Sequence, residues 1–296
     1  MMLNPSQYWD VGIKLVSGCT KYSPGCDHCW SLAMEKRFNQ GDGSVQFHPD
    51  RLNRFNKKKP TVFSIWNDLL HDKISFECIQ DTLDAMCDYR CEENTFLILT
   101  KRPQRWSEYY QWRGEYVAGV CPSLVTYEVL GTYPNIYFGL TVCNQQEADE
   151  KIPIFMQVPG KKFLSIEPML GPIDTRGLLW RYGEVPTPNG FGLVKYPLIN
   201  AVILGGETGS GARPMHPDWV RSVRDQCAAA GVPFFFKQWG EWAPDCLCST
   251  KKPHKDTPRP QPGKMGCMFR CGNKAAGRLL NGRTHDGLPW RTNVPK

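Results

Sequence analysis

Three cysteines lie close together near the start of the chain, spaced Cys-x6-Cys-x2-Cys at Cys19, Cys26 and Cys29. Thiolates are soft ligands that favour zinc, copper(I) or iron–sulfur clusters. A structural zinc ion takes four ligands, whereas three thiolates fit a cluster whose remaining iron is left open. The residues alone therefore leave two interpretations open: an iron–sulfur cluster, and a zinc ion completed by His28 or by a distant residue.

The cysteines are expected on a loop between a first strand and a first helix. A short apolar segment from Val11 to Val16 predicts the strand. The helix is predicted after the loop by apolar residues at helical spacing on one face, which are Trp30, Ala33, Met34 and Phe38. Ser23-Pro24-Gly25 within the loop is strong turn chemistry. We expect this turn to fold the loop back, so that the three thiolates converge.

Strand and helix patterns alternate along the rest of the chain. Further strands are predicted at Thr61–Trp66, Thr95–Thr100, Asn135–Thr141, Lys162–Ile166, Ala201–Leu204 and Pro233–Phe236. Helices are predicted by the spacing of Phe76, Ile79, Leu83 and Met86, over Gln104–Trp112, and from Pro217 through Cys227 with Gly231 as the stop. Strands that are apolar throughout are typical of a parallel sheet buried on both faces. The expected fold class is α/β, with a complete or partial β/α barrel over residues 1–240.

Two regions depart from this alternation. The stretch Arg181–Asn200, with several Pro and Gly residues, is interpreted as an insertion. Residues 241–296 are expected to form an irregular extension packed on the barrel, with a flexible or extended loop over Pro253–Gly263. The extension contains two close cysteine pairs, Cys246 with Cys248 and Cys267 with Cys271. They predict a candidate second metal site, for zinc or an iron–sulfur cluster, and four unconnected thiols are the alternative.

Polar residues follow the predicted strands. In parallel β/α folds the active site lies at the carboxyl ends of the strands, and the cysteine loop follows the first strand. The strand-end residues are Asn67, Asp68, Lys101, Arg102, Thr141, Asn144, Glu167, Glu207, Lys237 and Gln238. Any one of them alone more often caps a helix or forms a surface ion pair, so the joint pattern is what predicts a site on this face.

The composition indicates a globular protein of a reducing compartment. The chain has 296 residues, 13 cysteines and a formal charge of +7. It shows no apolar run as long as a membrane span and no signal peptide pattern at Met1–Ser6. We therefore expect a cytoplasmic location, no membrane partner, and thiols used as ligands rather than disulfides. The positive charge permits a nucleic-acid partner without demonstrating one.

Several segments together resemble a known family. They are the cysteine loop, "LTKRP", "SIEPMLGP", the long run "GGETGSGARPMHPDWVRSVRDQCAAAGVPFFFKQWGEW" and "KAAGRLLNGR". This set resembles the phage-associated three-cysteine-motif family, a branch similar to the radical S-adenosylmethionine (SAM) enzymes, from about Val11 to Arg283 with gaps. The resemblance implies a partial β/α barrel of radical SAM type, a 4Fe–4S cluster on the three cysteines and SAM. It also implies the host cytoplasm as the location if the chain is phage-encoded.

The chain departs from the commonest radical SAM pattern in three ways. That pattern is Cys-x3-Cys-x2-Cys, whereas the first gap here is six residues, and His28 stands where an aromatic residue usually precedes the last cysteine. In many relatives a Gly-Gly-Glu motif after the second strand holds the methionine amino group of SAM. Here Gly205-Gly206-Glu207 follows the sixth predicted strand. The amino-group role therefore passes by position to Asn67 or Asp68.

The resemblance implies radical chemistry. An external one-electron donor, such as flavodoxin or ferredoxin, would reduce the cluster, and SAM would yield a 5′-deoxyadenosyl radical that abstracts hydrogen from a substrate carbon. Position then assigns roles. Lys101 or Arg102 would pair with the methionine carboxylate. The residues expected to contact the cofactor elsewhere are Thr141, Asn144, Ser165 and Glu167. The residues expected to face the substrate are Glu207, Lys237 and Gln238.

The phage association suggests a base in DNA or a modified nucleotide as the substrate. One example is the isomerisation of a glycylated thymidine during thymidine hypermodification. Lys57-Lys58-Lys59 and Lys251-Lys252 would help to hold DNA, and exposed aromatic side chains would stack an extruded base. The alternative function is a zinc-stabilised nucleic-acid-binding protein without catalysis. A SAM-dependent methyltransferase is disfavoured because no glycine-rich loop follows the first strand.

Overall fold

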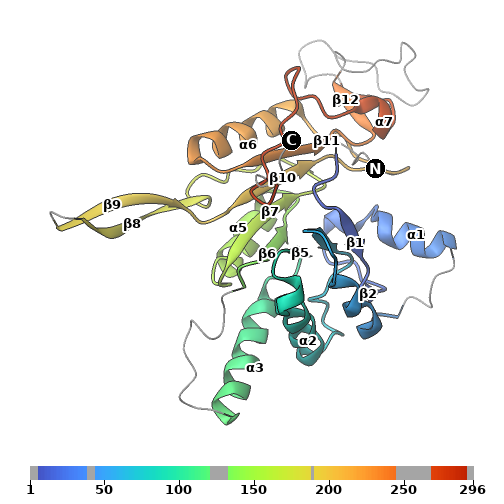
Figure 1. Cartoon of the computed structure of the whole chain (residues 1–296). Coiled ribbons are helices and arrows are strands. Elements are labelled where there is room, and N and C mark those ends of the chain that lie inside the picture. Colours follow the sequence, from blue (N-terminus) through green and yellow to red (C-terminus); the bar gives the residue numbers. More distant parts are fainter. Residues whose placement is uncertain (1–5, 39–43, 121–132, 188–189, 245–267, 292–296) are drawn as a thin grey trace. The chain divides into compact units, whose positions relative to one another are not determined.

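The computed structural model describes residues 6–38, 44–120, 133–187, 190–244 and 268–291. The chain divides into two compact units (Figure 1). Unit 1 consists of Met1–Thr141 and Asp149–Lys162, and unit 2 of Val142–Ala148 and Phe163–Lys296. In the part of the chain that the structure describes, no helix is both long and apolar enough to span a membrane.

Seven strands follow one another in chain order through the main sheet, as β1-β4-β5-β6-β7-β10-β11. Their bounds are β1 Val11–Ile13, β4 Val62–Ile65, β5 Thr95–Thr100, β6 Ile136–Thr141, β7 Lys161–Ile166, β10 Ala201–Gly205 and β11 Phe234–Gln238. The strand pairs within each unit are parallel. A doubly wound sheet would reverse its strand order at a switch point, whereas this order is that of a partial β/α barrel. The predicted α/β class is confirmed.

Most of the helices lie between these strands in the chain, and α7 follows the last strand. Their bounds are α1 Trp30–Phe38, α2 Phe76–Cys87, α3 Gln104–Val120, α5 Gln145–Phe155, α6 Pro217–Ala230 and α7 Asn273–Ala276. Helix α6 begins at Pro217 as predicted, and Gly231 caps its end with a φ of 72°, the left-handed conformation that glycine adopts freely. Helix α5 was not predicted. Its start signal is Asn144, whose side-chain oxygen accepts a hydrogen bond from the Glu147 N–H at 2.9 Å.

Aromatic side chains fill the core of unit 1. Phe55, Phe63 and Phe96 form a buried ring cluster with centroids 4.8 to 5.6 Å apart. Phe55 comes from a 3-10 segment, η2, at Pro49–Phe55, whereas Phe63 and Phe96 come from β4 and β5. Trp106 of α3 packs edge-on against Phe138 of β6 at 4.8 Å. These contacts fix the strands and therefore the positions of the residues that follow them.

The predicted strand over Val11–Val16 is wrong as a single element. Strand β1 ends at Ile13, whose carbonyl accepts hydrogen bonds from the N–H groups of both Trp66 and Leu15. The chain turns there, and β2 (Val16–Ser17) pairs antiparallel with β3 (Gln46–Phe47) in a separate ribbon. The cysteine loop therefore leaves from β2, and β3 lies beside the start of the loop.

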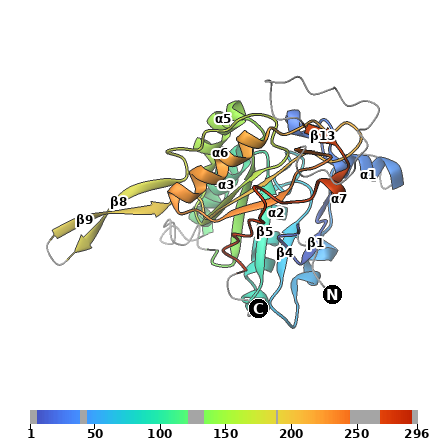
Figure 2. The ribbon, with the colours of Figure 1, turned by 90° about the horizontal axis from the view of Figure 1, so that it is seen from above.

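Unit 2 places α6 along β10 and β11, as both views show (Figures 1 and 2). The predicted insertion is a regular antiparallel hairpin of β8 (Trp180–Thr187) and β9 (Gly190–Pro197), which projects away from β10 and β11. Beyond Gly240, β12 (Trp242–Pro244) pairs antiparallel with β13 (Met268–Arg270). The chain then returns to β11, where the Phe236 N–H donates to the His285 carbonyl at 3.0 Å.

Part of the predicted extension lies outside the described residues. This part contains Cys246, Cys248, Cys267, Lys251-Lys252 and the loop Pro253–Gly263. Cys271 is described and is half-buried. The second metal site and the boundary at residue 240 therefore stay predictions.

Candidate functional site

The three cysteines are free thiols on a tightly turned loop between β2 and α1. The predicted Ser23-Pro24-Gly25 turn is present as a 3-10 segment, η1, at Pro24–Cys26. In this turn the Cys26 N–H donates to the Ser23 carbonyl at 2.8 Å, and the Cys29 N–H donates to the Cys26 carbonyl at 3.3 Å. Cys26 is buried, and Cys19 and Cys29 are half-buried.

The thiols influence one another electrostatically. Burial raises the pKa of Cys19 to about 11, and Asp68 and the other two cysteines add to the increase, while Arg102 opposes it. Across the described residues, no three His, Cys, Asp or Glu side chains are placed to hold one metal ion. A zinc ion draws its sulfur ligands to about 2.3 Å from one metal. A cluster binds each thiolate to a different iron, so it needs sulfur atoms that are farther apart.

Asn67, at the carboxyl end of β4, holds both ends of the cysteine loop. Its side-chain amide donates to the Val16 carbonyl at 2.9 Å, and its side-chain oxygen accepts from the Ser31 hydroxyl at 2.6 Å. Val16 precedes the loop and Ser31 lies in α1, which follows it. The backbone of Asn67 is in the left-handed region with a φ of 62°, which Asn tolerates better than most residues.

Glu35 of α1 fixes the start of the same loop. Its carboxylate accepts from Lys14 Nζ at 2.6 Å and from the Gly18 N–H at 3.2 Å. Burial alone would raise the pKa of Glu35, but these hydrogen bonds outweigh it and lower the pKa. Gly18 has a φ of 69°, and a Cβ there would lie 2.2 Å from the Ser44 carbonyl oxygen. The loop therefore requires glycine immediately before Cys19.

The buried ion pair of Asp68 and Arg102 also holds the cysteine loop, in addition to Asn67 and Glu35. Arg102 follows β5 and is only 2% exposed, and its guanidinium lies 2.7 Å from the Asp68 carboxylate. The same guanidinium donates to the Thr20 hydroxyl at 3.1 Å. Burial would lower the pKa of Arg102, but Asp68 outweighs it and raises the pKa. Thr100 donates to the other Asp68 oxygen at 2.7 Å. The Lys101 N–H also approaches Asp68, at 3.4 Å.

Three residues near these groups were missed by the sequence analysis. The Thr20 hydroxyl lies 2.9 Å from His71 Nε2. Burial lowers the pKa of His71, and the Arg102 charge lowers it further. The Tyr22 ring lies under the Arg102 guanidinium at 4.6 Å. Thr20 and Tyr22 lie between the first two cysteines, and this position in the sequence could have indicated a role in the loop. No sequence pattern around His71 indicated that it contacts the loop.

The apolar face predicted for α1 is turned outward. Trp30 is 52% exposed and Met34 is 47% exposed. The opposite face is the one that holds the loop, through Ser31 and Glu35. The helix therefore buries its polar contacts and exposes Trp30, Ala33 and Met34 of its apolar stripe, with Lys36 and Arg37 also exposed.

In unit 2, the strand-end charges are paired with one another. Glu167 follows β7, and its carboxylate lies 3.1 Å from Lys237 Nζ, which comes from β11. The Ser165 hydroxyl donates to the same carboxylate at 3.3 Å. Gly205 packs against this group, and a Cβ there would lie 2.7 Å from a Glu167 oxygen, so the Glu167 side chain would have to shift. Gly206 is required, because a Cβ there would lie 2.0 Å from the Trp239 carbonyl oxygen.

Glu207 is held by Arg213, a residue that the sequence analysis missed. The guanidinium binds both carboxylate oxygens, at 2.8 and 2.6 Å, and the Arg213 N–H adds a third hydrogen bond at 2.8 Å. The sequence feature that could have indicated this pair is the glycine-rich stretch between the two residues, which allows the chain to turn back within six positions. The Glu207 carboxylate is largely shielded from water at 6% exposed, whereas the Arg213 side chain remains partly exposed.

Three more predicted residues have defined surroundings. The side-chain amide of Gln238 donates to the Gly206 carbonyl at 3.0 Å, and its buried oxygen has no hydrogen-bond partner among the described residues. Asn144 caps α5, so its oxygen is already used. Thr141 is the last residue of β6 and is 3% exposed.

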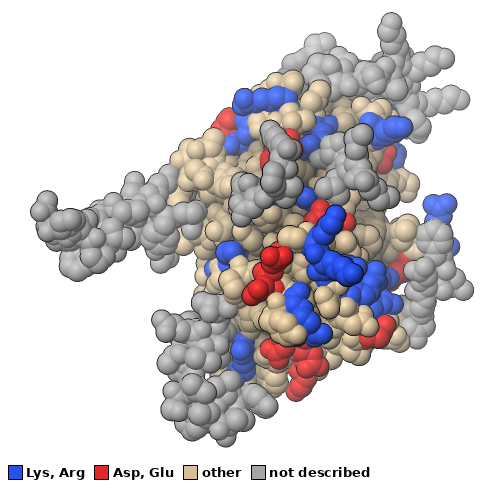
Figure 3. All heavy atoms as spheres, in the orientation of Figure 1, with Lys and Arg blue, Asp and Glu red and all other residues tan. Residues whose placement is uncertain are grey.

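The structure thus brings Asn67, Asp68 and Arg102 to the cysteine loop in unit 1. In unit 2 it brings Glu167 and Lys237 together. The roles assigned to these residues toward SAM and the substrate stay predictions. Lys57-Lys58-Lys59 is exposed as expected. Figure 3 shows Lys and Arg interspersed with Asp and Glu over the coloured residues of the face that it presents.

The fold and these contacts define an α/β protein with a clamped cysteine loop at the carboxyl ends of parallel strands. The chain belongs to the family described as "Protein of unknown function (DUF5131)", which it matches over residues 6–289. Neither the comparison with curated proteins nor the comparison with solved structures returned a match.

Proposed function

We propose that this protein is a radical SAM enzyme that holds a 4Fe–4S cluster on Cys19, Cys26 and Cys29. The observation that carries the proposal is the clamping of the cysteine loop from two neighbouring strand ends. Asn67 after β4 and Arg102 after β5 both hold it by hydrogen bonds. A loop of three free thiols with this support is suited to a fixed cofactor.

The residues present fit such a cluster. Three free thiols, which are soft donors, lie on one short loop that neighbouring strand ends hold in place. When bound, the cluster and SAM would supply an electron and then a radical able to take hydrogen from an unactivated carbon. The protein's part is to orient these groups and to exclude water from them.

The chain's own residues divide this work. Arg102 is the residue that we propose for the methionine carboxylate, with Lys101 beside it, because it presents a buried guanidinium next to the loop. Within unit 1, the proposed contact with the rest of SAM is Thr141, the last residue of β6.

Asn67 and Asp68 are less available for the methionine amino group than their position suggests. Asn67 already bonds to Val16 and Ser31. Asp68 bonds to Arg102, Thr100 and the Leu70 N–H. We therefore propose that both residues act mainly by positioning the loop.

The substrate side is assigned to Glu207, Lys237 and Gln238. Lys237 is half-buried against Glu167, and the Gln238 oxygen lacks a partner among the residues described. A base offers amide and carbonyl groups that match these donors and acceptors. We propose a nucleotide base in phage DNA as the substrate, with isomerisation of a glycylated thymidine as the example. The net charge of +7 and the exposed Lys57-Lys58-Lys59 support an anionic substrate.

The external one-electron donor also needs a docking surface. The exposed face of α1 offers Trp30 and Met34 for apolar contact, and Lys36 and Arg37 carry exposed positive charge on the same helix. Such a surface matches an acidic carrier protein, because complementary charge steers association. Its place directly after Cys29 puts the donor next to the thiols.

The test is an anaerobic assay of the reconstituted full-length protein. The protein is incubated with SAM, dithionite and modified phage DNA, and the DNA is digested to nucleosides for mass spectrometry. The proposal predicts a brown protein with iron and sulfide, formation of 5′-deoxyadenosine, and a nucleoside with changed retention at unchanged mass. A colourless protein that holds zinc and cleaves no SAM would instead support the zinc-stabilised nucleic-acid-binding alternative.

A further inference from the structure

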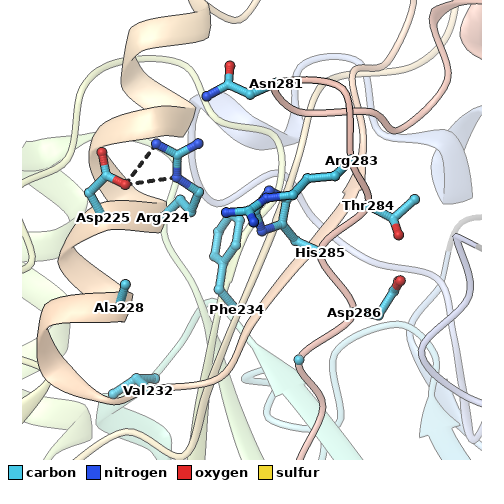
Figure 4. Close-up of a pocket in the computed structure, with 11 residues that line it drawn as sticks. Arg224, Asp225, Ala228, Val232, Phe234, Asn281, Arg283, Thr284, His285 and Asp286 are labelled. Atoms are coloured by element: carbon cyan, nitrogen blue, oxygen red, sulfur yellow. Dashed lines mark hydrogen bonds and ion pairs between the residues drawn. The ribbon is translucent and has the colours of Figure 1, made fainter.

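A pocket of about 680 Å³ lies within unit 2 at the amino end of β11 (Figure 4). The second half of α6 and the segment 281–287 form its walls, and Phe234 is the first residue of β11. Gln238, which is assigned to the substrate, lies at the opposite end of the same strand. The pocket is therefore separate from the groups at the carboxyl ends of the strands.

Two guanidinium groups face this pocket. Figure 4 shows those of Arg224 and Arg283 extending into the space between α6 and the 281–287 segment. Arg224 pairs with Asp225 at 2.8 Å, but that carboxylate lies on the side of Arg224 away from Arg283. Asp286 is paired with Arg278. Arg283 makes no ion pair with any described residue.

The surroundings of His285 have net positive character. Burial lowers the pKa of His285, and the charges of Arg283 and Arg224 lower it further, while a hydrogen bond with the Leu280 backbone and the charge of Asp286 oppose them. The imidazole packs edge-on against Phe234, with the ring centroids 5.7 Å apart. His285 is thus neutral near pH 7 and lies beside two cations.

The rest of the lining is apolar or able to donate hydrogen bonds. Ala228, Val232 and Phe234 provide an apolar wall. The Asn281 oxygen accepts from Arg221 at 3.0 Å, which leaves the Asn281 amide N–H groups as donors. The volume is within the range of about 300 to 1,000 Å³ typical of small-molecule sites.

We propose that this pocket binds a phosphate ester, with the phosphate between Arg224 and Arg283 and the organic part against Ala228, Val232 and Phe234. Guanidinium groups bind phosphate through paired hydrogen bonds, so two of them facing one space form a natural phosphate site. A free nucleotide and a nucleic-acid strand both supply this chemistry. The inference does not depend on the radical chemistry proposed above.

The test is calorimetric binding to the full-length protein. The probes are inorganic phosphate, thymidine 5′-monophosphate, and one single-stranded oligonucleotide with and without a 5′-phosphate. Arg283→Gln removes one guanidinium from the pocket. Arg176→Gln is the matched control, because Arg176 is an exposed arginine of unit 2 outside the pocket. We expect the monophosphate to bind more tightly than inorganic phosphate. Arg283→Gln should weaken binding about tenfold or more, and Arg176→Gln less than about twofold.

The oligonucleotide probes show whether the bound phosphate belongs to a nucleic-acid strand or to a free ester. Arg283-dependent binding of the strand without its 5′-phosphate assigns the site to a nucleic-acid backbone. Arg283-dependent binding of the mononucleotide alone assigns it to a free ester. Each result supports the proposal.

His285 supplies an independent readout. A bound phosphate offsets the two arginine charges, so it should raise the pKa of His285 in an NMR titration, with the signal assigned from His285→Gln. Three results would each overturn the proposal: no probe binds, both arginine variants weaken binding equally, or inorganic phosphate binds as well as the monophosphate.

Discussion

The two units treat their strand-end charges differently. In unit 1, Asn67 and Arg102 bond to the cysteine loop and Asp68 holds Arg102, so the strand ends position a loop that carries thiols. In unit 2, the strand-end carboxylates form ion pairs within the unit: Glu167 with Lys237, and Glu207 with Arg213. The difference teaches that similar strand-end patterns serve two tasks. The strand ends of unit 1 position a loop with three thiols, whereas those of unit 2 pair acidic side chains with basic ones.

The largest effect expected from this comparison is on the cofactor. Cys26→Ala should abolish cluster binding and SAM cleavage, because the cluster would lose one of its three thiolates. Cys87→Ala is the control, since Cys87 is an exposed free thiol at the end of α2. The measurements are iron content, visible absorption and 5′-deoxyadenosine. Full iron content and activity in Cys26→Ala would contradict the assignment.

Lys237→Met in unit 2 should separate the two tasks. It should keep the cluster and some SAM cleavage but lose the modified nucleoside, because Lys237 is assigned to the substrate. If this variant lost its iron as completely as Cys26→Ala, the division of work between the units would be wrong.

The next effect is on stability. Arg102→Met leaves Asp68 buried without its cation, and breaking a buried ion pair costs about 3 to 5 kcal/mol. Arg213 is 33% exposed along its side chain. Water can therefore replace part of its contact with Glu207, and Arg213→Met should cost about 1 to 3 kcal/mol. Denaturant unfolding of both variants beside the wild type measures the difference. Equal losses of unfolding free energy would show that the Asp68–Arg102 pair does not contribute more to stability than the Glu207–Arg213 pair.

These contacts show how far the sequence could lead. The strands of the main sheet after the first, the α/β class and the polar residues at strand ends follow from apolar periodicity and from the polarity that follows each strand. The antiparallel pairs outside this sheet were not predicted. Thr20 and His71 were missed as well, because their hydrogen bond joins residues 51 positions apart and leaves no periodic signal. The outward face of α1 was missed for another reason. Periodicity finds an apolar stripe but does not say whether the polar side is the one that packs.

A buried lysine near the amino end of a strand makes stability depend on pH. Lys162 lies near the amino end of β7, and burial lowers its pKa from 10.5 to about 8. Below pH 8 Lys162 is protonated in both the folded and the unfolded chain, so the folded state carries the full free-energy cost of burying the charged ammonium group. Between about pH 8 and 10.5 only the unfolded chain keeps the proton, so stability should rise with pH.

Lys162→Met should therefore stabilise the protein at pH 7 by about 2 kcal/mol and remove this rise. The check is the free energy of unfolding at pH 7 and pH 9.5. Lys58→Met, at an exposed position, serves as the control. A variant less stable than the wild type at pH 7 would show that the lysine makes a net favourable contact.

The smallest predicted effect concerns the outer face of unit 1. The double variant Lys36→Glu with Arg37→Glu reverses the charge of the α1 surface without touching Ser31 or Glu35, which hold the loop. With an acidic flavodoxin as the electron source, turnover at limiting donor should fall about tenfold, and the loss should grow as ionic strength falls. With dithionite, which needs no docking surface, turnover should stay at the wild-type level. Lys57→Glu with Lys58→Glu makes the same charge change elsewhere in unit 1 and should leave both rates unchanged. An equal loss with both reductants would place the fault in the loop, and an equal loss in both double variants would reduce the effect to net charge.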